Sequence, residues 1–124
     1  MILGIGTDLV EIARIRRAWE RHGDRLADRV LGTAERECLP AGDPSAWLAK
    51  RFATKEAVAK ALGTGFRDGL RLADIQTRHD GNGRPEVALD GVAAMSLERL
   101  GGRTVSLSVT DERAYALAFV VISD

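Results

Sequence analysis

The sequence has few features that would cross-link the chain or anchor it in a membrane. Cys38 is the single cysteine among 124 residues, so an internal disulfide and a zinc site built from cysteine pairs are both excluded. The longest apolar run, residues 115–122, is far shorter than a bilayer-spanning helix. The first residues carry Asp8 and Glu11 and lack the basic segment of a signal peptide. We therefore expect a cytoplasmic protein with no membrane partner.

The sequence also lacks an excess of charge of either sign. Its 18 basic and 18 acidic side chains give a formal net charge of zero, which argues against a general nucleic-acid-binding protein. The apolar content of 45% and the charged content of 29% are typical of a globular domain. No repeat, linker or low-complexity segment divides the chain. We expect a single domain over residues 1–124, large enough to bury a core without disulfides or a structural metal.

Hydrophobic periodicity predicts an α+β fold. Strands are expected at residues 1–9, 74–79, 85–89, 104–109 and 115–122. Helices are expected at residues 11–22, 26–31, 33–38, 45–62 and 92–100. The longest helix, which has Ser45 as its expected N-cap, should pack on an antiparallel sheet. The last strand is apolar on both faces, and we expect it to be a buried central strand.

Asp8 is the first candidate functional residue. It follows Gly4 and Gly6, which permit close backbone approach, at the expected end of the first strand. Carboxylates at such strand ends often face a ligand. A cap for the following helix is an equally good interpretation of Asp8 from the local sequence.

Glu56 and Lys60 form the second candidate group, because they are four residues apart on one face of the longest helix. The simplest interpretation is a surface ion pair that contributes roughly a few tenths of a kcal/mol. Alanines at 53, 57 and 61 indicate close packing of the same helix, and the glycine loop 63–65 follows directly. Two carboxylates and several cations beside such a loop would suit Mg²⁺ and a phosphate ligand.

A row of arginines is the third feature. Arg14, Arg17, Arg21 and Arg25 would line one face of the first helix if that helix continued to residue 25. The apolar stripe of that helix, which includes Ile12, lies on the opposite face. Such a row is usually a solvated face, and the alternative is a docking surface for an acidic protein.

Several segments together resemble the holo-acyl-carrier-protein synthases, the small single-domain class of 4′-phosphopantetheinyl transferases. The strongest matches are GIGTDLVEI at 4–12 and RFATKEAVAKALGTG at 51–65. Further matches are NGRP at 82–85 and DERAYA at 111–116. A lone GxGxD would be weak, but KEAxxKALGTG at this distance from Asp8 is highly specific. The resemblance covers nearly the whole chain.

The resemblance implies an enzyme that moves the 4′-phosphopantetheine group of coenzyme A to a serine of apo acyl carrier protein. The second product would be 3′,5′-ADP, and the reaction would support fatty-acid or polyketide biosynthesis. The resemblance also implies use of Mg²⁺ and a homotrimer with its active sites in the clefts between subunits.

The resemblance further implies roles for individual residues. The expected Mg²⁺ ligands are Asp8 and Glu56, which with Lys60 make up the expected catalytic group. Lys60 would face the coenzyme A phosphates. The other expected cofactor-binding residues are Arg51, Gly63, Thr64, Gly65 and, from the neighbouring subunit, Gly83, Arg84 and Pro85. The resemblance implies that Arg14 contacts the carrier protein. Arg17 and Arg21 lie on the same expected helix face, and we expect them to contact it too.

The sequence departs from the family pattern in two places. Many members have a histidine after a Ser-x-Ser segment, where this chain reads Ser106-Leu107-Ser108-Val109, so Ser108 and Thr110 are the candidates for that contact. Arg84 stands where the family has lysine, which keeps the charge and changes its geometry.

Two alternatives to a transferase stay open. One is a catalytically silent member that binds coenzyme A or a carrier protein without transfer, and the other is a structural trimer-forming domain. Loss of a catalytic residue would favour the silent member, but Asp8, Glu56 and Lys60 are all present.

Overall fold

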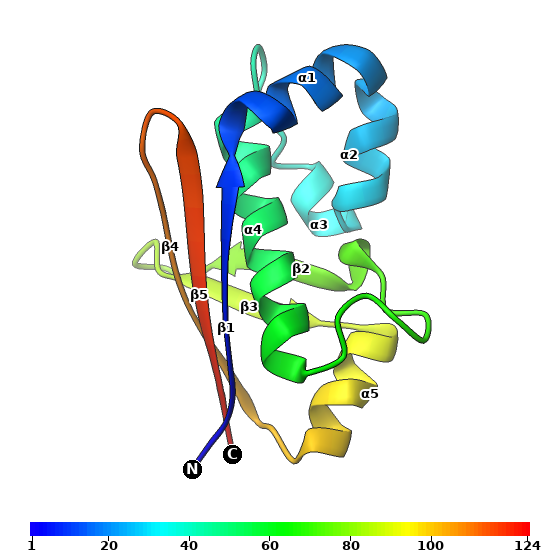
Figure 1. Ribbon diagram of the computed structural model, residues 1–124, viewed down its shortest axis with the longest axis vertical. Coiled ribbons are helices and arrows are strands. Elements are labelled where there is room, and N and C mark those ends of the chain that lie inside the picture. The colour runs from blue at the N-terminus through cyan, green and yellow to red at the C-terminus, as the bar shows by residue number, and fades with distance from the viewer.

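The computed structural model describes residues 1–124 as an α+β fold with antiparallel sheets (Figure 1). The strands are β1 (Ile2–Glu11), β2 (Ile75–His79), β3 (Pro85–Leu89), β4 (Thr104–Asp111) and β5 (Tyr115–Ser123). The helices are α1 (Ile12–His22), α2 (Asp24–Val30), α3 (Thr33–Arg36), α4 (Ser45–Leu62) and α5 (Gly91–Leu100), with a short 3₁₀ helix at Leu72–Asp74. No helix combines the length and the apolar character that a membrane span requires.

The strands form two antiparallel sheets rather than the single sheet expected from the sequence. One sheet has the order β1-β5-β4, and the second is the hairpin of β2 and β3. The central position expected for the last strand is confirmed, because β5 pairs with β1 on one side and with β4 on the other. In Figure 1, α4 runs alongside β1 and β5, with α1, α2 and α3 gathered at one end and α5 at the other.

Two glycines let α4 approach β1 unusually closely. A Cβ atom added to Gly4 would lie 2.0 Å from the carbonyl oxygen of Ala61, and one added to Gly6 would lie 2.0 Å from that of Ala57. Both alanines are buried. The expected close packing is therefore confirmed, since any side chain at either glycine would push the strand off the helix.

The first strand is longer than expected, which changes the setting of Asp8. β1 stays paired with β5 up to Glu11, and Asp8 lies opposite Ala118 within the strand rather than at its end. Asp8 therefore does not cap α1. Because side chains alternate along a strand, Asp8 shares the inner face of β1 with Gly4 and Gly6 and is directed toward α4.

Several other boundaries differ from the expectations. α1 ends at Gly23, whose φ of 52° breaks the helix, so Arg25 belongs to α2 and not to the arginine row of α1. Ser45 is the first residue of α4 rather than its N-cap, and its backbone N–H donates to the Asp43 carboxylate at 3.0 Å. Gly63 ends α4 in the left-handed conformation (φ 79°), as expected.

The outer face of the three-stranded sheet is uncovered, so β5 is buried on one face only. Its inward side chains, among them Ala118 and Val120, are fully buried, whereas Leu117 and Phe119 are 40% and 45% exposed. The expectation of a strand buried on both faces is wrong for the single chain. The physical reason is that the helices, including α4, cover only one side of this sheet.

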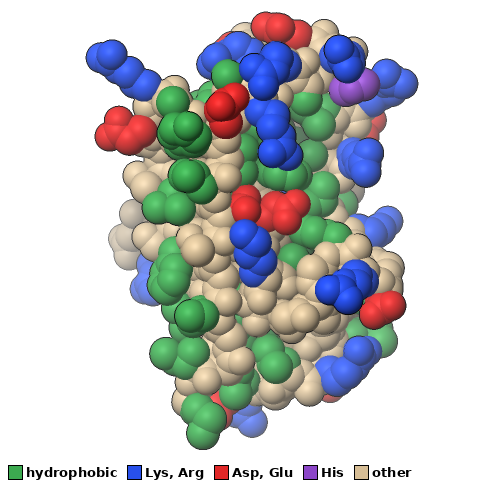
Figure 2. Space-filling model, in the orientation of Figure 1, with side chains coloured by type: hydrophobic (Ala, Val, Ile, Leu, Met, Phe, Trp, Pro, Cys, Tyr) green, Lys and Arg blue, Asp and Glu red, His purple; other side chains and the backbone are tan.

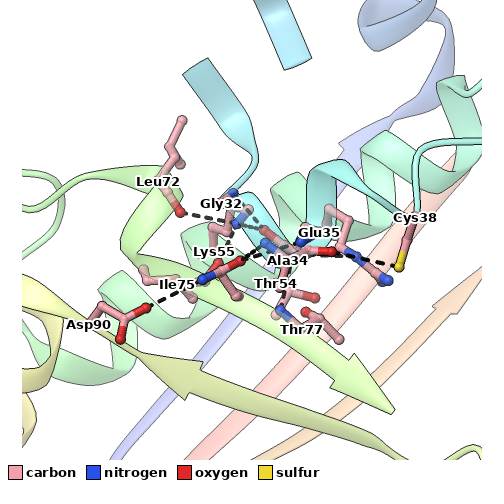
Figure 3. Close-up of polar contacts among 12 residues, drawn as sticks. Gly32, Ala34, Glu35, Cys38, Thr54, Lys55, Leu72, Ile75, Thr77 and Asp90 are labelled. Carbon is pink, nitrogen blue, oxygen red and sulfur yellow. Dashed lines mark hydrogen bonds and ion pairs between the residues drawn. The ribbon is translucent and has the colours of Figure 1, made fainter. Parts of the chain in front are cut away.

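A buried charged network ties α4 to α3 and β2 (Figure 3). The Lys55 ammonium donates to Glu35 at 2.6 Å and to the carbonyl oxygens of Leu72, at 3.0 Å, and Ile75. The Glu35 carboxylate also accepts from the backbone N–H of Thr77 at 3.0 Å. Lys55 and Glu35 are almost completely inaccessible, with 1% and 0% of their side chains exposed. These contacts fix the segment 72–77 against the middle of α4.

Candidate active site

Asp8 and Lys60 meet where β1 crosses α4. The Lys60 ammonium donates to Asp8 Oδ1 at 3.1 Å and to the carbonyl oxygen of Thr7 at 2.9 Å. The side chain of Asp8 is 17% exposed and that of Lys60 is 54% exposed, so the pair lies at the surface. The surface ion pair that spacing suggested between Glu56 and Lys60 is not formed, because Lys60 pairs with Asp8 instead.

Glu56 faces the same pair from one turn earlier on α4. Burial raises the pKa of the Glu56 carboxyl group above its ordinary value, and the negative charge of Asp8 raises it further. Lys60 and Arg14 act on this pKa in the opposite direction. The structure therefore brings Asp8, Glu56 and Lys60 together, and it places Arg14 within electrostatic reach of them.

The carboxylates of Asp8 and Glu56 suit a divalent cation of the Mg²⁺ type. Repulsion by Asp8 helps to raise the pKa of Glu56 even with Lys60 and Arg14 nearby, so a further cation would stabilise the two carboxylates in their charged forms. No group of three or more histidine, cysteine or acidic side chains is arranged to hold a metal anywhere in the chain. Two carboxylates alone match the Mg²⁺ preference for few protein oxygens supplemented by water and phosphate oxygens.

The glycine loop follows this group at the C-terminal end of α4. Gly63 and Gly65 have φ values of 79° and 58°, which favour glycine over other residues. The Gly65 N–H donates to the Ala59 carbonyl oxygen at 3.3 Å, and the Thr64 hydroxyl donates to the Gly65 carbonyl oxygen at 3.0 Å. The loop is thus ordered by its own hydrogen bonds one turn beyond Lys60.

Arg51 does not join this group. Its side chain is 8% exposed, its Nε lies 3.3 Å from Glu35 Oε2, and its guanidinium stacks over Trp47 at 4.6 Å from the ring centroid. Burial lowers the pKa of Arg51, and Glu35 opposes that shift. In a single chain these surroundings make Arg51 a part of the buried network, with its guanidinium held between Glu35 and Trp47.

The buried ion pair of Glu35 and Lys55 was not predicted from the sequence. Lys55 entered only as part of the matching stretch at 51–65, and Glu35 was not singled out. The spacing of Gly32 and Glu35 carried a partial signal, since Glu35 accepts from the Gly32 N–H at 3.2 Å in the manner of a capping box. Nothing in the local sequence linked Glu35 to a lysine 20 residues later.

Gly83 and Arg84 lie in the turn before β3, and Pro85 is the first residue of β3. All three are more than 70 residues from Asp8 in the sequence. The turn closes the β2–β3 hairpin, as expected, and the Asp80 carboxylate accepts from the Arg84 N–H at 2.9 Å. This hydrogen bond and a second one from the Asn82 N–H, at 2.8 Å, lower the pKa of the Asp80 carboxyl group. Arg84 and Pro85 line a groove of about 380 Å³ together with Arg103 on the segment leading into β4.

The expected carrier-binding arginines are exposed on α1. Arg14, Arg17 and Arg21 point to solvent, while Ile12 and Ile15 on the opposite face are buried. Arg17 lies 3.5 Å from Glu11. Figure 2 shows acidic side chains at the centre of one face with basic side chains above and below them. Of the three α1 arginines, Arg14 is the one that acts on the pKa of Glu56.

Comparison with known proteins gives relatives over the whole chain. A holo-[acyl-carrier-protein] synthase of Alkalilimnicola ehrlichii is 54% identical and covers 98% of this chain and 97% of its own length. The crystal structure of the corresponding synthase from Neisseria meningitidis is 45% identical, has a TM-score of 0.92 and covers both chains completely. The Helicobacter pylori synthase, solved in complex with coenzyme A, is 29% identical with a TM-score of 0.84 and covers 96% of this chain and 99% of its own.

A family model also matches almost the entire sequence. The model of the 4′-phosphopantetheinyl transferase superfamily covers residues 4–120, a range that includes β1, α4 and most of β5. All four stretches that carried the resemblance in the sequence fall inside it. The fold, the residues gathered where β1 crosses α4, and the relatives agree, and the chain belongs to the holo-[acyl-carrier-protein] synthase family of the 4′-phosphopantetheinyl transferase superfamily.

Proposed function

We propose that this protein transfers the 4′-phosphopantetheine group of coenzyme A to a serine of apo acyl carrier protein. The observation that carries the proposal is the meeting of Asp8, Glu56 and Lys60 where β1 crosses α4. The coenzyme A complex of the Helicobacter pylori relative supports coenzyme A as the donor. Fatty-acid or polyketide biosynthesis is the process that such a reaction would serve, and we propose the cytoplasm as its location.

The proposed reaction is a phosphoryl transfer between two oxygens. The serine hydroxyl oxygen of the carrier protein forms a new bond to the phosphorus that bears the pantetheine arm. The bond from that phosphorus to the bridging pyrophosphate oxygen breaks, its electron pair stays on that oxygen, and 3′,5′-ADP leaves. The serine proton is released. Such reactions depend on positioning and on stabilising charge more than on covalent help from the protein.

Asp8 and Glu56 are the residues that would hold Mg²⁺ in this site. The ion, when bound, supplies positive charge to the pyrophosphate. Lys60 provides a fixed cationic group on the same side, and its contact with the Thr7 carbonyl oxygen orients its ammonium group across the strand. Gly63 and Gly65 have no side chains, so phosphate oxygens can approach the backbone of the loop.

The decisive experiment is the conversion of an apo carrier protein followed by mass spectrometry. Wild-type protein with coenzyme A and Mg²⁺ should add one phosphopantetheine mass to the carrier and release 3′,5′-ADP. Asp8→Ala should leave the carrier unmodified while keeping its circular dichroism spectrum. Binding of coenzyme A by the wild type without any mass increase would identify the silent alternative and refute the proposed transfer.

We also propose a homotrimer with shared active sites. The uncovered face of the β1-β5-β4 sheet supports this assembly, because Ile5 and Leu9 are exposed beside Leu117 and Phe119. Apolar patches of this kind commonly mark protein interfaces. Gly83, Arg84 and Pro85, which lie away from Asp8 in one chain, would then approach the coenzyme A of a neighbouring subunit.

Sedimentation tests the proposed assembly. The wild type should sediment as a trimer at micromolar concentration, and Leu117→Glu should sediment as a monomer because three buried carboxylates would face an apolar interface. A wild type that is an active monomer would overturn the shared-site arrangement.

A further inference from the structure

A groove opens beside Glu56, and the segment between α4 and β2 forms one of its walls. The groove has a volume of about 710 Å³, and Phe52 and Glu56 face it from successive turns of α4. Residues 70–73, called the wall below, line the same groove. The position of the wall relative to Glu56 therefore shapes the opening next to the proposed transfer site.

The buried ammonium group of Lys55 anchors the wall to α4. It donates to the carbonyl oxygens of Leu72, at 3.0 Å, and Ile75 (Figure 3). Its third acceptor is the Glu35 carboxylate at 2.6 Å. An ammonium group has three N–H donors, so these three acceptors use all of them. Because only 1% of the Lys55 side chain is exposed, solvent has almost no access to compete for these bonds.

The two sequence neighbours of Glu56 make separate contacts. Ala57 fixes α4 against β1, the strand that carries Asp8, since a Cβ atom at Gly6 would lie 2.0 Å from the Ala57 carbonyl oxygen. Lys55 fixes the wall instead. The arrangement of the two carboxylates and the placement of the wall thus depend on different residues. A change at Lys55 should move the wall while Asp8 and Glu56 keep their places.

We infer that Lys55 is a positioning residue for the proposed transfer, and that it acts through the carbonyl oxygens of Leu72 and Ile75 to hold the wall beside Glu56. The inference rests on the proposed function. Its side-chain bonds go to these two oxygens and to Glu35, so Lys55 touches no reacting atom. Phosphoryl transfer depends on positioning, and a displacement of about 1 Å can cost roughly 10²-fold in rate. A loosened wall should therefore lower kcat.

The kinetic test is Lys55→Met, which keeps a long side chain and removes the three N–H donors. The assay is run at a temperature at which circular dichroism shows the variant to be folded. We expect kcat for carrier modification to fall at least tenfold. The Mg²⁺ concentration that gives half-maximal turnover should change less than twofold, because Asp8 and Glu56 stay in place.

Hydrogen exchange measures the wall directly, without turnover. The Leu70 N–H donates to the carbonyl oxygen of Arg67 at 3.1 Å, and the Asp74 N–H donates to that of Arg71 at 3.1 Å. Both N–H groups should exchange at least tenfold faster in Lys55→Met, because the segment opens locally more often. Wild-type exchange together with a reduced kcat would show that the wall is not involved and would overturn the inference.

A matched control separates positioning from loss of stability. Ile122 is fully buried on β5 and takes no part in the buried network, and Ile122→Ala lowers stability by leaving a cavity in the core. The folded Ile122→Ala protein should keep kcat within twofold of the wild type and should keep the slow exchange of Leu70 and Asp74. Equal losses of kcat in Ile122→Ala and Lys55→Met would assign the effect to stability and overturn the inference.

Lys55→Gln covers the case in which Lys55→Met does not fold. Its amide group offers two N–H donors to three acceptors, so kcat should fall at least threefold with an unchanged Mg²⁺ dependence. Wild-type kcat in either folded variant would overturn the inference, as would a change confined to the KM for coenzyme A. These outcomes leave the proposed function intact, since that function is refuted by a wild type that does not modify the carrier protein.

Discussion

Lys55 and Glu56 are adjacent on α4 yet belong to opposite kinds of charged site. Lys55 is buried, paired with Glu35 and bonded to two backbone carbonyl oxygens. Glu56 lies at a groove beside a second carboxylate, and its raised pKa reflects burial and repulsion by Asp8 that Lys60 and Arg14 compensate only in part. A satisfied buried charge fixes structure, whereas a partly compensated one at the surface is poised to bind a further cation.

The largest effect should follow loss of the Glu56 charge. Glu56→Gln keeps the size of the side chain and removes a metal-binding carboxylate, so turnover should fall by about 10³-fold, in line with the loss of one strong electrostatic contact at a reacting centre. Carrier modification at saturating Mg²⁺, followed by mass spectrometry, measures it. Wild-type turnover in this variant would show that Glu56 is not a metal ligand.

Loss of the neighbouring charge should act on stability. Lys55→Met leaves the Glu35 carboxylate buried with only Arg51 as a cationic neighbour. We expect a loss of about 3 kcal/mol in the free energy of unfolding, the lower end for a broken buried pair, because Arg51 remains. Urea denaturation measures this change. The control is Lys50→Met on the same helix, where a partly exposed pair with Asp111 should contribute at most about 0.5 kcal/mol. Similar losses in both variants would remove the distinction between the two sites.

The next effect concerns Arg14, the exposed arginine of α1 that acts on Glu56. Arg14→Glu should raise the KM for carrier protein more than tenfold, because an acidic partner would meet repulsion in place of attraction. The KM for coenzyme A should change little. Added salt should weaken carrier binding in the wild type more than in Arg14→Ala, since the Debye length is about 8 Å at physiological ionic strength. Equal changes in both KM values would indicate damage to the coenzyme A site.

The smallest effect is on thermal stability and depends on pH. Because the folded-state pKa of Glu56 lies above its ordinary value of 4.5, the charged carboxylate is less stable in the fold than in the unfolded chain. Glu56→Gln should therefore raise the Tm at pH 7 by a few degrees. This gain should shrink as the pH falls through the folded-state pKa and vanish below 4.5, where Glu56 is protonated in both states. A gain that is independent of pH would assign the effect to packing rather than charge.

Much of the site was predictable because its signals are local or periodic. Gly4 and Gly6 predicted close backbone approach, and the alanines of the longest helix, including Ala57, predicted close packing. The structure shows that these two surfaces meet each other. Glu56 and Lys60 share a helix face because of their spacing alone. The role of Asp8 was only half predictable, since its position inside β1 depends on pairing with β5, more than 100 residues away.

The sequence by itself determined the α+β class, the central place of β5 and the helix 45–62, because these follow from hydrophobic periodicity and from glycine at the helix end. Tertiary structure decided which charges meet. Lys60 turns to Asp8 rather than to Glu56, and Arg51 turns inward to Glu35, because contacts between distant segments satisfy charges that neighbouring residues cannot reach. Such pairings depend on the three-dimensional path of the backbone, which leaves no periodic pattern in the sequence.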